Sequence, residues 1–72
     1  MPMTVEINDG ALLKDLMDAL ARSGCRAQRT ADRACHVIHP LASSKAEAML
    51  EVAFFLRAWE LRHPGFAATL TP

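Results

Sequence analysis

The stretch from Ser43 to Gly65, SSKAEAMLEVAFFLRAWELRHPG, predicts one long helix, and it constrains the fold more than any other part of the chain. Ser44 stands three residues before Glu47, which is the capping-box spacing of a helix start. Pro64 disfavours helical geometry in the residue before it, and Gly65 tolerates the turn that follows. About twenty residues lie between these signals, enough for roughly 30 Å of helix.

This helix has two apolar faces when its residues are placed at about 100° per step. The broad face consists of Ala48, Met49, Val52, Ala53, Phe55, Leu56 and Trp59. A second face, the narrow row, consists of Leu50, Phe54, Ala58 and Leu61. The two faces are centred roughly 150° apart, so a sheet that covers the broad face leaves the narrow row uncovered. The narrow row therefore needs another neighbour, either the first helix of the same chain or a second chain.

The rest of the chain alternates between strand and helix patterns. Strands are predicted at 4–7, 25–29, 34–39 and 66–70, and a first helix at 11–22. Gly24 follows this helix at the position of a left-handed C-cap, and residues 30–33 form the turn between the two middle strands. The buried face of the third strand stays open, because Val37 and Ile38 are adjacent and point to opposite sides.

The order strand, helix, strand, strand, helix, strand is the split βαβ arrangement of ferredoxin-like domains. With right-handed crossovers, it predicts a four-stranded antiparallel sheet with both helices on one face. We therefore expect residues 1–72 to form a single small α+β domain with the ferredoxin-like βαββαβ fold. Because many unrelated functions use this fold, the fold alone indicates no activity.

The 72 residues carry eight basic and eight acidic side chains, so the formal net charge is zero. Such a balance argues against a protein built mainly to hold nucleic acid or an anionic membrane surface. No segment has the pattern of a signal peptide or the apolar length of a membrane span. We therefore expect a cytoplasmic location with no membrane partner. In the cytoplasm, a protein with two cysteines usually keeps both as thiols.

Cysteine and histidine side chains offer metal-ligand and nucleophile chemistry, but without the spacing that either function needs. Cys35 and His36 point to opposite sides of the third strand, and so do His36 and His39. Cys25 is offset from Cys35 across the hairpin, which disfavours a disulfide. A structural zinc site usually has two close ligand pairs, and a catalytic cysteine needs an oriented base. We therefore predict no metal, no cofactor and no catalytic residue, and we expect a protein that is not an enzyme.

Basic residues gather around the predicted hairpin. They are Arg22, Arg26, Arg29 and Arg33, with Asp32 as the one acid among them. Such a cluster could hold a phosphate or an RNA backbone, but ferredoxin-like RNA-binding modules also carry aromatic residues on the central strands. This chain has no Phe, Tyr or Trp there. We therefore expect no specific nucleic-acid binding and interpret these arginines as a solvated strand face.

The end of the long helix, LRAWELRHPG at 56–65, resembles that of a group of small uncharacterised bacterial proteins. In those proteins a long helix closes with a similar Leu-Arg-Ala-Trp-Glu and His-Pro-Gly pattern. The resemblance implies no activity and carries over no site residues.

Two functions from different classes fit the sequence. The leading hypothesis is a non-enzymatic interaction or regulatory module, which docks on a partner protein or forms a homo-oligomer through the narrow row. The alternative is a small-ligand or anion-binding regulatory domain, with possible ligand residues Arg26, Gln28, Arg29 and His36. A concavity lined by Arg26, Gln28 and His36 would favour ligand binding, whereas a flat apolar sheet face would favour protein contact.

Overall fold

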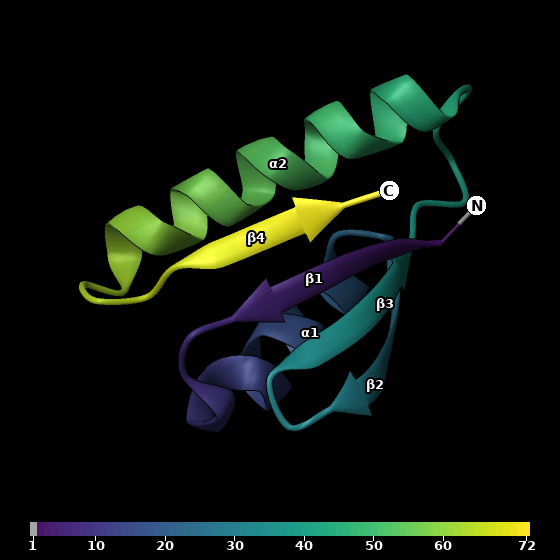
Figure 1. The fold of residues 1–72 in the computed structure, drawn as a ribbon. Coiled ribbons are helices and arrows are strands. Elements are labelled where there is room, and N and C mark those ends of the chain that lie inside the picture. Colours follow the sequence, from purple (N-terminus) through teal and green to yellow (C-terminus); the bar gives the residue numbers. More distant parts are fainter. Residues whose placement is uncertain (1) are drawn as a thin grey trace.

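The chain forms one sheet and two helices in the computed structural model, which describes residues 2–72 (Figure 1). Its elements in chain order are β1 (Met3–Ile7), the 3-10 turn η1 (Gly10–Leu12), α1 (Leu13–Arg22), β2 (Arg26–Ala31), β3 (Ala34–Ile38), α2 (Lys45–Arg62) and β4 (Ala68–Thr71). Neither helix in this described part of the chain has the length and apolar character needed to cross a membrane.

The four strands form one antiparallel sheet in the order β2-β3-β1-β4. Figure 1 shows α1 behind the sheet, while α2 runs alongside β4. The predicted α+β class, with a four-stranded antiparallel sheet and two helices, is confirmed.

One face of the sheet carries the hydrophobic core. Along β1, the side chains of Met3, Val5 and Ile7 are buried, whereas Thr4 and Glu6 point to the opposite, open face. Buried residues of both helices belong to the same cluster as the buried residues of β1. The core therefore lies between the sheet and the two helices, and the other face of the sheet is left open to solvent.

Pairing with β1 decides which side of β3 is buried. Met3 lies opposite Val37, and Val5 lies opposite Cys35. Residues that are directly opposite in an antiparallel pair share a face, so Cys35 and Val37 point into the core and are fully buried. Ile38 therefore points to the open face, where it is 39% exposed.

The start of α2 follows its capping signal only in part. Ser44 Oγ accepts a hydrogen bond from Glu47 N at 3.1 Å, as a helix N-cap does. The Glu47 carboxylate accepts a hydrogen bond from the Ser43 hydroxyl instead of returning to the cap backbone. This hydrogen bond lowers the pKa of the Glu47 carboxyl. The broad face points to the core as predicted, with Ala48, Val52, Leu56 and Trp59 buried and its other three residues half-buried.

Glycines in left-handed conformation follow both helices. Gly24 has φ 96° and Gly65 has φ 88°. Residues with a Cβ rarely adopt these angles, so both turns depend on glycine. The C-cap prediction for Gly24 is confirmed.

Several predicted boundaries are wrong by a few residues. The first helix opens as the turn η1, and α-helical bonding begins only at Leu13. β2 extends to Ala31, which shortens the hairpin turn to residues 32–33. β3 ends at Ile38. β4 begins at Ala68 rather than at residue 66, because Phe66 N donates to the carbonyl of His63 at 3.0 Å and prolongs the turn after α2.

Candidate functional site

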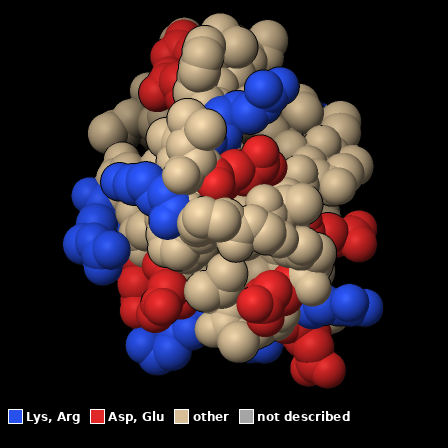
Figure 2. Space-filling model, turned by 90° about the vertical axis from the view of Figure 1, so that its left-hand side faces the viewer, with Lys and Arg blue, Asp and Glu red and all other residues tan. Residues whose placement is uncertain are grey.

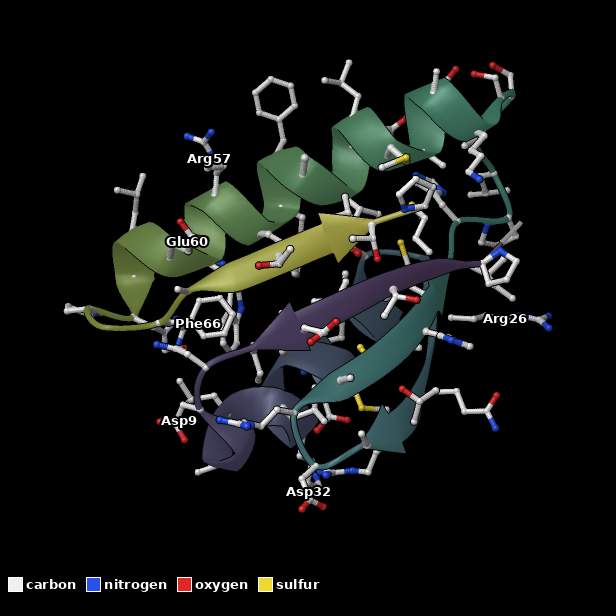
Figure 3. The ribbon with its side chains drawn as sticks, in the orientation of Figure 1. Asp9, Arg26, Asp32, Arg57, Glu60 and Phe66 are labelled. Carbon is white, nitrogen blue, oxygen red and sulfur yellow. The ribbon has the colours of Figure 1, made fainter. Side chains whose placement is uncertain are left out.

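The narrow row lies on the solvent side of α2. Leu50, Phe54 and Leu61 are 59%, 67% and 86% exposed, and Ala58 is exposed as well. Figure 3 shows the neighbouring Arg57 projecting from α2 away from the sheet, which marks the direction of this face. Because α1 does not cover the row, the alternative of an internal helix contact is wrong. The row is an apolar face of a kind that small monomers seldom leave in water.

Charged side chains border the narrow row in a graded order. Glu47 and Glu51 lie in the first half of α2, and Arg57 and Arg62 lie in the second half. All four are exposed. This order complements the helix dipole, which favours acids near the start of a helix and bases near its end. The face therefore has one negative end and one positive end.

An open depression on the uncovered face of the sheet brings together three of the four possible ligand residues. Its volume is about 550 Å³, and its lining includes Arg26, Gln28, His36 and Ile38. Gln28 lies opposite His36, and Arg26 lies opposite Ile38, in the antiparallel pair of β2 and β3. Directly opposite residues share a face with Cβ atoms about 4.5–5.5 Å apart. The structure therefore has a concavity here in which polar side chains lie beside a larger apolar surface, and a concavity is the feature that favours ligand binding.

Arg29, the fourth possible ligand residue, lies outside this depression. It stands opposite Cys35, whose side chain points into the core, so Arg29 emerges on the helix-covered side of β2. Its Nη1 donates to the carbonyl oxygen of Asp32 at 3.3 Å. The predicted grouping of Arg29 with Arg26 does not hold, because residues three apart on a strand point to opposite faces.

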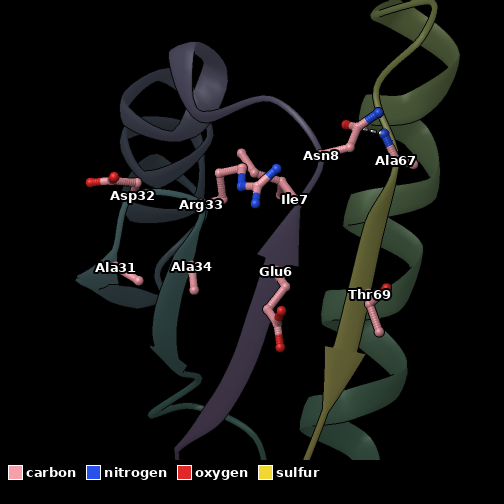
Figure 4. A pocket seen from close by; sticks show the side chains of 9 residues that line it. All are labelled: Glu6, Ile7, Asn8, Ala31, Asp32, Arg33, Ala34, Ala67 and Thr69. Atoms are coloured by element: carbon pink, nitrogen blue, oxygen red, sulfur yellow. Dashed lines mark hydrogen bonds between the residues drawn. The ribbon is translucent and has the colours of Figure 1, made fainter.

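A second depression lies where the hairpin turn, the end of β1 and the start of β4 meet (Figure 4). Its volume is about 590 Å³, and it is lined by Glu6, Ile7, Asn8, Ala31, Asp32, Arg33, Ala34, Ala67 and Thr69. Asn8 Nδ2 donates to the carbonyl oxygen of Gly65 at 2.8 Å, and its Oδ1 accepts from Ala67 N at 2.9 Å. The lining carries the carboxylates of Glu6 and Asp32 and the guanidinium of Arg33, so it favours neither anions nor cations.

A small cavity of about 110 Å³ brings a thiol, an imidazole and a carboxylate together between the two helices. His39 Nε2 donates to Glu51 Oε1 at 3.0 Å, and the other ring nitrogen of His39 is buried without a partner. Burial raises the pKa of the nearby Cys25 thiol, and the Glu51 carboxylate raises it further, against a lowering hydrogen bond from Ser23. A raised pKa disfavours the reactive thiolate form of Cys25.

The His39–Glu51 pair has no signature in the sequence. The two residues are 12 positions apart, one in the turn after β3 and one in α2. Only the tertiary fold, which places α2 beside the residue that follows β3, brings them together. Within residues 2–72, no group of three or more His, Cys, Asp and Glu side chains converges to hold a metal ion.

Trp59 belongs to a small aromatic cluster at the end of α2. Its side chain is 4% exposed, and its ring stacks on His63 with centroids 3.9 Å apart. Phe66 meets the Trp59 ring edge-on at 5.2 Å. His63 Nδ1 donates to the Trp59 carbonyl oxygen at 3.0 Å. The interpretation of Trp59 as a core residue is confirmed, and the cluster seals the core at this end.

Comparison with protein-family models, curated proteins and solved structures finds no match to this chain. The two surfaces with the clearest chemistry are the narrow row of α2 and the open-face depression beside β2.

Proposed function

We propose that this chain is a non-enzymatic interaction or regulatory module that self-associates through the narrow row of α2. The observation that carries the proposal is the exposure of Leu50, Phe54 and Leu61 on the helix face opposite the core. Their exposed fractions amount to about two whole side chains, whose burial would contribute about 3–6 kcal/mol per chain. Two chains contribute twice this amount, against an association cost of about 4–15 kcal/mol.

A second copy of the chain, lying antiparallel to the first, is the occupant that fits the shape of the row. In the register that sets Leu50 level with Leu61 of the other copy, Phe54 lies within one residue, about 1.5 Å along the helix, of the small Ala58. A large side chain then meets a small one twice, which lets the two helix backbones approach closely. Such a contact uses the same surface on both copies and closes as a dimer.

The charges beside the row support the same orientation. Antiparallel pairing brings the acidic first half of one α2 against the basic second half of the other. Glu51 and Arg62 are 11 residues apart, about three helical turns, so they lie on the same flank of α2. The register given above brings the half-exposed Glu51 carboxylate, which also accepts from His39 of its own chain, to the same flank as Arg62 of the other copy, at the polar rim of the contact. A parallel pair would instead bring like charges together.

The ferredoxin-like fold and a cytoplasmic location are further parts of this proposal. The chain order βαββαβ and the strand order β2-β3-β1-β4, with a helix in each crossover, support the fold. The resemblance of the ending LRAWELRHPG to small bacterial proteins supports a shared helix terminus. Free thiols at both Cys25 and Cys35 support the location.

Replacing Phe54 by glutamate tests the self-association. Phe54 is 67% exposed, so Phe54→Glu should leave the chain folded and make it monomeric. Leu41→Glu is the matched control, because Leu41 is 82% exposed but lies outside α2. Sedimentation equilibrium or light scattering gives the mass, and circular dichroism reports the fold.

We expect a dimer for the wild type and for Leu41→Glu. A folded wild type that stays monomeric up to about 1 mM would refute the proposal, since such a contact would have no useful affinity. Equal loss of association in both variants would show that the narrow row is not the interface.

A further inference from the structure

We propose that the open face of the sheet binds a small organic oxyanion, a carboxylate or phosphate with a short apolar group, between Arg26, Gln28 and His36. This site is independent of the narrow row, because it lies on the sheet face that the helices leave uncovered. Its lining joins three polar side chains with the apolar surface of Ile38 and Pro2. An anion with an apolar end matches that mixture.

Each polar residue supplies a donor that suits an oxyanion. The Arg26 guanidinium presents paired N–H groups that fit the two oxygens of a carboxylate or phosphate. The Gln28 amide and the His36 ring each add an N–H donor. Ile38, directly opposite Arg26 and 39% exposed, offers an apolar contact next to the charged group. The strand register therefore places the Arg26 guanidinium, two further N–H donors and one apolar side chain on a single patch.

The local charge favours an anion at this end of the open face. Along the four described strands, the one carboxylate on this face is Glu6, which lies opposite Ala34 and lines the second depression. Figure 3 shows Arg26 extending from the sheet into solvent, far from Asp32 at the other end of the hairpin. The Arg26 guanidinium is therefore available to a ligand.

A nucleic acid fits this surface less well than a small anion. None of the strands β1 to β4 carries a Phe, Tyr or Trp on which a base could stack. Figure 2 shows basic and acidic side chains interspersed over the side of the molecule that lies away from Arg26, so no continuous positive track extends onto that side. A single Arg26 suits one anionic group.

Arg29 offers a matched control for the experiment, because Arg26→Ala and Arg29→Ala remove the same charge from the same strand on opposite faces. Amide nitrogen–proton correlation spectra are recorded during titration with butyrate, acetate or inorganic phosphate, at constant ionic strength. We expect saturable shifts at residues 26–28 and 36–38, and tighter binding of butyrate than of acetate. Arg26→Ala should weaken binding by about fivefold or more, as loss of a charge-assisted contact does, while Arg29→Ala stays within about twofold.

Three results would overturn the site. Shifts that do not saturate would show weak surface accumulation of anions, and equal weakening by the two arginine variants would show a general charge effect. Tighter binding of a short single-stranded RNA than of any small anion, with the same residues shifted, would identify a nucleic-acid surface instead. Circular dichroism of both variants verifies that each remains folded.

Discussion

Leu56 and Leu50 lie on the same helix at opposite faces, so truncating each to alanine separates folding from association. Leu56 is 4% exposed within the core, whereas Leu50 is 59% exposed in the narrow row. Leu56→Ala removes buried atoms and leaves a cavity, which typically costs about 2–5 kcal/mol. The whole stability of a domain of this size is about 4–11 kcal/mol. Leu56→Ala should therefore lower the melting temperature by about 10–30 °C.

Leu50→Ala should act on association instead. An exposed side chain contributes little to the stability of the folded monomer. The substitution should therefore change the monomer's free energy of unfolding by no more than about 0.5 kcal/mol. In the proposed dimer, the buried part of Leu50 contributes about 1 kcal/mol per chain beyond alanine. Both copies lose it together, so the dissociation constant should rise by roughly 30-fold.

Thermal unfolding followed by circular dichroism at several protein concentrations separates the two effects. At the lowest concentration, where monomer dominates, only Leu56→Ala should melt early. At high concentration the Leu50→Ala variant should lose the stabilisation that dimer formation adds by mass action. If Leu50→Ala lowers the melting temperature of the dilute protein as much as Leu56→Ala does, the assignment of faces on α2 is refuted.

Two further predictions concern the thiols and the Asn8 contacts. Burial raises the pKa of both Cys25 and Cys35 above the ordinary 9.0, so the unfolded thiols ionise first. Below about pH 9 the buried, protonated thiols should make their whole contribution to the free energy of unfolding. This contribution should be lost as the pH rises through the pKa values of the thiols in the folded state. Urea unfolding at several pH values measures this fall in the free energy of unfolding. The fall should be smaller in a variant that carries both Cys25→Ala and Cys35→Ala. Asn8→Ala should cost about 1–2 kcal/mol, because it removes the hydrogen bonds to Gly65 and Ala67. Faster hydrogen exchange at the Ala67 amide should accompany that loss, and unchanged exchange would contradict the role of Asn8.

Local signals in the sequence predict the elements and most of their faces. Ser44 and Gly24 mark helix ends through their own chemistry, so a short stretch of chain is enough to locate them. The spacing of apolar residues in α2 likewise separates its buried face from the exposed narrow row. These features depend on the helical period and on backbone geometry, which the sequence carries directly.

Contacts between distant segments are what the sequence does not predict. The side of β3 that is buried depends on its register with β1, which places Val37 opposite Met3. The His39–Glu51 pair depends on the placement of α2 relative to the residue that follows β3. Extension of β2 to Ala31 depends on ladder bonds to β3, so the hairpin turn is tighter than its sequence predicts. None of these has a local period or motif, since each needs the tertiary arrangement first.

The position of β1 has a consequence for synthesis on the ribosome. β1 is made first yet lies between β3 and β4, and β4 is made after all the other elements. At a translation rate of about 5–20 residues per second, one edge of β1 waits about 3–12 seconds for its partner strand. During that interval the nascent chain presents an unpaired apolar strand edge, which other chains can pair with. The four-stranded sheet is therefore completed only once β4 has emerged, and until then one edge of β1 stays open to pairing with other chains.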